Sequence, residues 1–232
     1  MNKKDFYLKK IGRRGKIDIW LVDGAKIRRD LEKDFTNFAE YYYFPIIPKY
    51  EFWIDRESVP NERRFFIDHL LAEWRLMDGG MSYQRAKEIA NQKELSERKK
   101  AGDLEKVINQ KSEFSPEKVH RRLLDKTKDE IDIWLVDGRL VRSAFDIGFT
   151  EGGHDLVYQY VPKNEVWIDD DVFAKERPYV LLHELYERSL MKSGLTYLRA
   201  HRKASRLEWR ARHSEQILDE FFLKFLIKKG KI

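Results

Sequence analysis

The chain has 232 residues, with 46 basic and 40 acidic side chains, a net charge of +6 and no cysteine. The lack of cysteine excludes disulfides and thiolate metal sites, and no apolar run approaches the ~20 residues of a membrane span, so the sequence predicts a cytoplasmic protein with no membrane span. The mixed charge permits nucleic-acid binding without requiring it.

The chain contains an internal duplication. Residues 17–94 recur as residues 131–208 at a constant offset of 114 positions, and 30 of the 78 aligned residues are identical without a gap. Unrelated segments of this composition would share only about 5. The duplication therefore predicts an α+β fold made of two copies of one unit, each a small antiparallel sheet followed by a helical hairpin.

The two predicted units are joined by a charged segment and followed by an apolar tail. We expect a first unit at 1–94, an exposed helical linker at 95–128, a second unit at 129–208 and a C-terminal amphipathic helix at 209–232. The tail is too apolar to remain in water, so it either lies on a membrane surface or docks on the body of the protein. Docking is the favoured interpretation.

Strands are predicted at the start of each unit. An alternating apolar run ends in Asp-Gly, which is the strongest short hairpin signal. Hairpins are therefore predicted for 16–22 with 25–29 and for 130–136 with 139–143. A second antiparallel pair is predicted for 41–47 with 50–55 and for 156–161 with 165–169.

Helices are predicted after the strands, where the apolar period changes from 2 towards 3.6. In the second unit a helix over 176–192 is stopped by Ser193-Gly194, and Thr196 caps a further helix that reaches Glu208 or beyond. Ser82 is the equivalent cap in the first unit. Each unit is expected to end in a tight helical hairpin.

This second hairpin carries two histidines and two glutamates at helical spacing. His183 and Glu187 are four residues apart and share a helix face, whereas His201 and Glu208 are seven apart and share a face of the next helix. If the hairpin brings these faces together, two imidazoles and two carboxylates have the ligand types of a zinc or iron site. The sequence therefore predicts a divalent transition-metal site.

The segment His183-Glu184-Leu185-Tyr186-Glu187 resembles the His-Glu-x-x-His helix of the zincin metallopeptidases, with Glu in place of the second histidine. The resemblance covers about 30 residues. It implies that His183 is a metal ligand, that Glu184 is the general base and that Glu187 replaces the second ligand. His201 or Glu208 would then supply the third ligand, as a glutamate does in the gluzincin branch.

His154 is a further candidate. It follows Gly152-Gly153 in the region between the predicted strand pairs, where a glycine pair allows the backbone to approach a site closely. It would serve either substrate binding or a fourth coordination position, and the alternative is that Gly-Gly-His is simply a turn.

The first copy keeps part of this constellation. It retains His69, Glu73 and Glu94, but it has three different residues at the positions of Glu184, His201 and His154, namely Leu70, Lys87 and Glu40. Since a protonated lysine cannot ligate a metal, we expect Lys87 to neutralise Glu73 and Glu94 in a disabled copy. The alternative is that both clusters are buried hydrogen-bonded networks that join two helices without a metal.

Two functions follow from these patterns. The first is a metal-dependent hydrolase, peptidase-like and acting on polypeptide, with one intact and one degenerate site. The second is a non-enzymatic binding module that contacts nucleic acid through its basic runs, with tyrosines for stacking. The residues of this second hypothesis are Lys99-Lys100, Arg121-Arg122, Arg199 to Arg206, Lys228 to Lys231 and Tyr41 to Tyr43.

Overall fold

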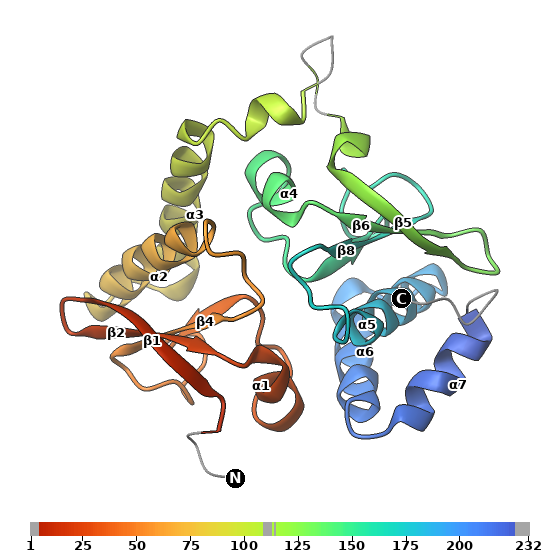
Figure 1. Ribbon diagram of the computed structural model, residues 1–232, viewed down its shortest axis with the longest axis horizontal. Helices are drawn as coiled ribbons and strands as arrows, with labels where there is room; N and C mark the ends of the chain where they lie inside the picture. Colours follow the sequence, from red (N-terminus) through yellow and green to blue (C-terminus); the bar gives the residue numbers. More distant parts are fainter. Residues whose placement is uncertain (1–4, 109–112, 114, 226–232) are drawn as a thin grey trace. The chain divides into compact units, whose positions relative to one another are not determined.

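The computed structural model describes residues 5–108, 113 and 115–225. The chain divides into two compact units, Met1–Leu104 (unit 1) and Glu105–Ile232 (unit 2), and each holds one four-stranded sheet (Figure 1). The predicted α+β class and its tandem duplication are confirmed. No helix within the described ranges has the length and apolar character needed to cross a membrane.

Unit 2 repeats the helices and strands of unit 1 in the same order and adds a further helix, α7. Unit 1 comprises β1 (Tyr7–Arg14), β2 (Ile17–Val22), α1 (Gly24–Asp30), β3 (Phe38–Glu40), β4 (Glu51–Asp55), α2 (Arg63–Asp78) and α3 (Tyr83–Lys100). Unit 2 comprises β5 (His120–Lys126), β6 (Asp132–Val136), α4 (Gly138–Ala144), β7 (Gly152–His154), β8 (Glu165–Asp169), α5 (Arg177–Lys192), α6 (Tyr197–Ala211) and α7 (Glu215–Phe225).

The sheets are mixed rather than wholly antiparallel. Their orders are β1-β2-β4-β3 and β5-β6-β8-β7, and the central pairs β2 with β4 and β6 with β8 are parallel. Asp18 pairs with Glu51, and Asp132 pairs with Glu165, so the register of the central pair repeats at the offset of 114. The chain can make this parallel pair because a helix and the short strand β3 or β7 cross over between the two central strands.

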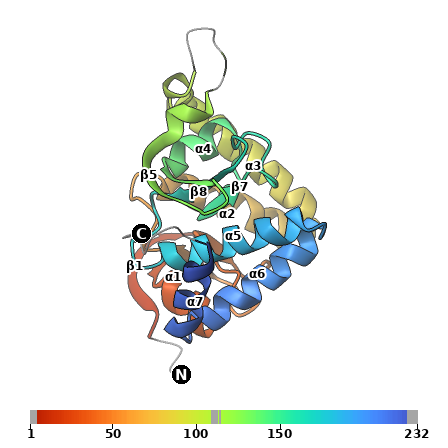
Figure 2. The same cartoon turned by 90° about the vertical axis from the view of Figure 1, so that its right-hand side faces the viewer.

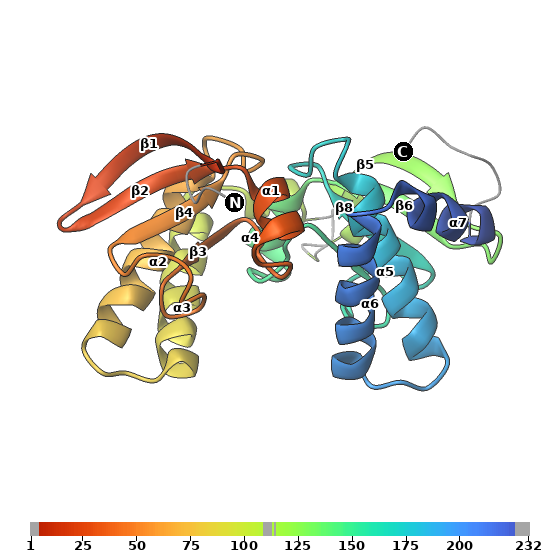
Figure 3. The ribbon, with the colours of Figure 1, turned by 90° about the horizontal axis from the view of Figure 1, so that it is seen from below.

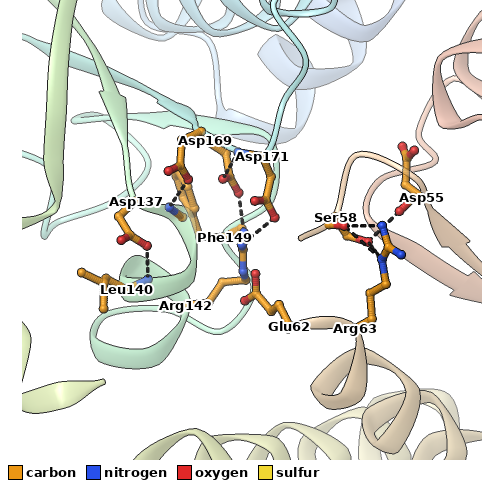
Figure 4. Close-up of polar contacts among 12 residues, drawn as sticks. Asp55, Ser58, Glu62, Arg63, Asp137, Leu140, Arg142, Phe149, Asp169 and Asp171 are labelled. Atoms are coloured by element: carbon orange, nitrogen blue, oxygen red, sulfur yellow. Dashed lines mark hydrogen bonds and ion pairs between the residues drawn. The ribbon is translucent and has the colours of Figure 1, made fainter. Parts of the chain in front are cut away.

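The predicted hairpins across Asp-Gly are wrong, because a helix begins there in both units. The carboxylate of Asp23 accepts a hydrogen bond from the amide of Lys26 at 3.3 Å, and Asp137 accepts from Leu140 at 2.9 Å (Figure 4). The aspartate is thus a helix N-cap. The real hairpin lies one strand earlier, between β1 and β2, and turns at Gly15, which has φ +59°.

The glycine of each Asp-Gly pair is needed for close packing against the end of the neighbouring strand. A Cβ atom on Gly24 would lie 1.7 Å from Oδ2 of Asp55, and one on Gly138 would lie 2.1 Å from Oδ1 of Asp169. A buried arginine holds each of these aspartates, as Figure 4 shows for Arg142 between Asp169 and Asp171. The repeated Asp-Gly therefore marks a helix N-cap followed by a close contact with the end of a neighbouring strand, and not a hairpin turn.

The prediction of a second strand pair is correct for one strand of each pair and wrong for the other. Its later strands, β4 and β8, form where expected, but residues 41–47 and 156–161 contain turns and no strand. The antiparallel partners of β4 and β8 are the short strands β3 and β7. In β7 the glycines are required, since a Cβ atom on Gly153 would lie 2.5 Å from the ring of Tyr158. The sequence lacked a strand pattern here because these partners are three residues long.

Each sheet separates two hydrophobic cores. In β4, Trp53 points into a core with Ile27 of α1, whereas its neighbours Phe52 and Ile54 pack with Phe66 of α2 on the opposite face. This alternation follows the two-residue period of a strand. The helical hairpins α2–α3 and α5–α6 can be followed in Figures 2 and 3. Each hairpin is therefore anchored by one helix to one face of its sheet.

The prediction for the linker is wrong, whereas the prediction that the tail docks on the protein is confirmed. The segment 95–128 is not a helical linker, because its start completes α3 and its end forms β5, with Val107 and Val119 buried in a core. In the tail, α7 docks through the buried side chain of Phe221 on the core of unit 2. Docking is thus confirmed for residues 215–225, and the basic run at 228–231 lies outside the described residues.

Candidate metal centre

The candidate site lies between α5 and α6, whose ends were predicted well. Ser193 and Gly194 end α5, and Gly194 adopts φ +97°, which glycine tolerates. Thr196 then precedes the first turn of α6, although its side chain makes no capping hydrogen bond. The short turn sets the two helices side by side (Figure 3), so residues of both helices meet along their shared face.

Three predicted ligands come together at one point. Nε2 of His183 lies 3.2 Å from Nδ1 of His201 and 3.5 Å from Oε2 of Glu187. The same oxygen of Glu187 lies 2.8 Å from Nδ1 of His201. The side chains of His183 and Glu187 are 11% and 4% exposed, whereas that of His201 is 38% exposed. The cluster is therefore buried on the α5 side and open to solvent on the α6 side.

Glu208 does not join this point but holds His183 from behind. Its Oε2 lies 2.8 Å from Nδ1 of His183, so the Nδ1 proton is donated to the carboxylate and Nε2 faces the cluster. Arg212 fixes the other oxygen of Glu208 at 2.8 Å and also contacts Glu176 at 2.6 Å. A carboxylate behind a ligating histidine is the usual support of a metal-bound imidazole.

His154 also acts on a neighbour rather than on the shared point. The amide of Leu156 donates to its Nδ1 at 3.2 Å, so the neutral ring carries its proton on Nε2. That Nε2 lies 3.1 Å from Oε1 of Glu187 and donates to it. A nitrogen that carries a proton cannot ligate a metal. His154 therefore supports Glu187: it binds Oε1 of the carboxylate, while Oε2 faces the cluster.

Glu184 lies beside the cluster and not within it. Its carboxylate lies within 4.8 Å of ligand atoms of both His154 and Glu187. Gly152 packs against it, since a Cβ atom there would lie 3.2 Å from Cγ of Glu184. Burial raises the pKa of Glu184, and the nearby imidazoles only partly oppose this rise. A carboxylate whose pKa is raised by burial holds a proton more readily than an exposed one, as a general base that accepts and then returns a proton must do.

Hydrogen bonds between His183 and the glutamates favour the charged form of each group. Burial alone would lower the pKa of His183, but hydrogen bonds to Glu187 and Glu208 raise it well above its ordinary value. Burial would raise the pKa of Glu187, yet hydrogen bonds from three histidines hold it well below its usual range. Positive charge is thus favoured at this point, whether it is carried by protons or by a cation.

The spacing of the three donor atoms suits a metal. Zinc binds nitrogen and oxygen ligands at roughly 2.0–2.2 Å, so tetrahedral donor atoms lie about 3.4 Å apart. The distances from His183 to His201 and Glu187 are already 3.2 and 3.5 Å. The His201–Glu187 distance of 2.8 Å is that of a hydrogen bond and would have to widen by about 0.6 Å. If a metal ion replaced the proton shared by His201 and Glu187, its bonds to both donor atoms would set this wider spacing.

The equivalent cluster in unit 1 is built differently. His69 lies 2.9 Å from Glu94 and 3.6 Å from Glu73, which repeats the contacts of His183. However, Leu70 is part of the apolar core, and Glu40 occupies in β3 the register position that His154 occupies in β7. Among the described residues of unit 1, no three histidine or acidic side chains around His69 bring ligand atoms within 4.8 Å of one another. In the part that the structure describes, unit 1 therefore keeps His69, Glu73 and the supporting Glu94 but lacks a third ligand.

The predicted ion pair of Lys87 is wrong. Its side chain is exposed, and its ammonium lies over the ring of Tyr83 at 5.7 Å rather than beside Glu73 or Glu94. The neutralising charge comes instead from His69, because hydrogen bonds to Glu73 and Glu94 outweigh its burial and raise its pKa to about 9. A flexible lysine on the solvent side of the hairpin gains more from hydration than from entering the cluster.

Sequence reasoning missed the buried arginines behind both clusters. Arg98 lies 2.6 Å from Glu62 and 2.8 Å from Glu94, as Arg212 does with its own two glutamates. Arg98 and Arg212 share the offset of 114 but lie four positions beyond the compared segments. Extending the comparison by one helical turn would have found this pair.

We expect a pH-dependent stability in unit 1 that depends on His69. Its pKa rises from 6.5 when unfolded to about 9 when folded, so the stabilisation is complete below pH 6.5 and is lost as the pH rises through 9. At 1.36 kcal/mol per pKa unit the effect is on the order of 3 kcal/mol. Urea unfolding from pH 6 to 10 should therefore show a steeper loss in the wild type than in His69→Gln. Equal slopes would contradict the assignment.

No family model, curated protein or solved structure matches this chain significantly. Its function must therefore be inferred from the geometry of this site.

Proposed function

We propose that unit 2 binds one divalent transition metal, with zinc as the first candidate, and uses it to hydrolyse a peptide-like substrate. The observation that supports this most is the meeting of Nε2 of His183, Oε2 of Glu187 and Nδ1 of His201 within 4.8 Å of one another. These are borderline-soft nitrogen and oxygen donors, which suit zinc. Three protein ligands leave a position for water or substrate.

A bound metal would polarise the substrate carbonyl and lower the pKa of a water molecule at the site. Glu184 would accept the proton of that water as its oxygen adds to the carbonyl carbon. When the carbon–nitrogen bond breaks, the same carboxyl group would return the proton to the leaving amine. Glu208 and His154 would keep His183 and Glu187 oriented throughout this cycle, because each is bound to one of them.

The half-open position of His201 supports access by an extended substrate. His201 is the most exposed of the three donors, so the point they share is reached from the α6 side. Gly152 brings the short strand β7 against Val180 and Glu184 of α5, and all three residues of β7 are buried, so we expect substrate to enter from the α6 side.

The test is metal-dependent hydrolysis by the full chain. Protein stripped with a chelator should not cleave a fluorescent unfolded polypeptide, and one equivalent of Zn²⁺ should restore cleavage. Glu187→Gln should abolish this activity, whereas Glu73→Gln at the equivalent place in unit 1 should retain it. Zinc binding without cleavage would contradict the hydrolase, and a failure to bind zinc would contradict the metal site as well.

A further inference from the structure

The outer face of α6 carries a row of unpaired cations. The side chains of Arg199, Arg202, Lys203, Arg206 and Arg210 are all exposed. Within the part of the chain that the structure describes, none of the five forms an ion pair or a hydrogen bond through its side chain. Exposed cations on helices are commonly matched by a carboxylate three or four residues away, and this face has none.

Helix geometry places the five cations close together. At 3.6 residues per turn they fall within an arc of roughly 100°, opposite the buried side chains of Ala200, Ala204 and Ala211. From residue 199 to residue 210 the helix rises about 17 Å, which gives about one cation per 4 Å. Phosphates in one strand of DNA are 3.4 Å apart along the axis. The row therefore matches the charge density of a nucleic-acid backbone.

The equivalent helix in unit 1 shows that packing does not require these charges. At the five positions related by the offset of 114, α3 carries Arg85, Glu88, Ile89, Gln92 and Ser96. Arg85 is paired with Glu88 at 2.8 Å, so the net charge of this set is zero, against +5 on α6. Both helices nevertheless pack against their partners in the same way. The charges of α6 thus serve something other than the fold.

The other exposed groups on this face favour a nucleic acid over a membrane. Trp209 is 43% exposed and Leu198 is 56% exposed, and both lie beside the cations. They are 11 residues apart, or about 17 Å, so they do not form the continuous apolar stripe of a membrane-surface helix. A single exposed indole among arginines is suited to stack on a base. Four of the five cations are arginines, whose planar group binds phosphate through two hydrogen bonds.

We propose that the outer face of α6, formed by Arg199, Arg202, Lys203, Arg206, Trp209 and Arg210, binds nucleic acid through its phosphate backbone. This inference goes beyond the proposed hydrolase and does not need the metal. Single strands are the preferred form, because Trp209 can reach a base that is not stacked in a duplex.

The experiment measures binding of a labelled single-stranded oligonucleotide of about 30 nucleotides and of its duplex, by fluorescence anisotropy with a chelator present. Five phosphate contacts predict that the logarithm of affinity falls with that of salt concentration with a slope of about −3.5 for the single strand. The triple variant Arg202→Gln, Lys203→Gln, Arg206→Gln should reduce this slope by about 2 and weaken binding at least 10-fold.

A matched control distinguishes an effect of the α6 face from an effect of the net charge of the chain. The variant Arg85→Gln, Lys87→Gln, Lys93→Gln removes three cations from α3, so both triple variants lower the net charge from +6 to +3. The control should change affinity less than about 2-fold. Equal weakening by both variants, no binding at roughly 0.05 M salt, or binding to vesicles with anionic lipid in preference to the oligonucleotide would overturn the proposal. Because the chelator keeps metal out of the assay, the result does not depend on whether the proposed metal site exists.

Discussion

Glu184→Gln is expected to retain the metal of unit 2 and to lower the rate of hydrolysis by about 10²–10⁴-fold. The amide has nearly the same shape as the carboxylate but cannot accept a proton. Glu184 is not one of the three donors that meet at the shared point, so its loss should leave zinc affinity almost unchanged. The measurements are a zinc titration and single-turnover cleavage by the zinc-loaded variant.

Two results would contradict this role. A variant that cleaves at the wild-type rate would remove Glu184 from the mechanism, and a variant that loses zinc would make it a ligand. The control is Glu187→Gln, which should lose zinc and activity together because Oε2 of Glu187 faces both histidines. The separation of metal binding from turnover therefore identifies the base.

Arg98→Met is expected to destabilise unit 1 by about 3–5 kcal/mol, because it leaves buried carboxylates without their guanidinium. Arg98 is fully buried and contacts Glu62 and Glu94 at 2.6 and 2.8 Å. Adding Glu62→Gln should recover part of the loss, since it removes one of the stranded charges. Urea unfolding followed by tryptophan fluorescence measures both effects. A loss below about 1 kcal/mol would show that the cluster is solvated.

The equivalent variant in unit 2 distinguishes support of the fold from support of the metal. Arg212→Met should destabilise its unit by a similar amount and also weaken zinc binding by about 10–100-fold, because Arg212 holds Glu208 and Glu208 holds His183. Arg98→Met should leave zinc affinity unchanged. Equal effects of the two variants on zinc would contradict the difference between the units.

The duplication and the helices could be read from the sequence because they rest on many residues at once. The 30 identities fixed the equivalence of the units, and the stop at Ser193-Gly194 marked the end of α5. The Asp-Gly signal failed because the same two residues suit a hairpin turn and a helix N-cap. What decides between them is the aspartate at the end of β4 or β8, which is distant in sequence.

The candidate site was predictable as a set of residues but not as a set of roles. Helical spacing brought His183, Glu187 and His201 together, and the structure agrees with that placement. The positions of Glu208 and His154 depend on which nitrogen of an imidazole faces which oxygen. These orientations, like the exposure of Lys87, depend on contacts between different helices and strands. No local sequence pattern predicts them.

The metal content of three proteins tests the central claim most directly. Wild type, His69→Ala and His183→Ala would be purified without a tag, equilibrated with zinc, freed of excess and measured by elemental analysis. We predict one zinc per chain in the wild type and in His69→Ala, and none in His183→Ala, because His183 has a ligand partner in His201 and His69 has none in Lys87. Equal zinc in all three proteins, or none in the wild type, would contradict the proposed metal centre.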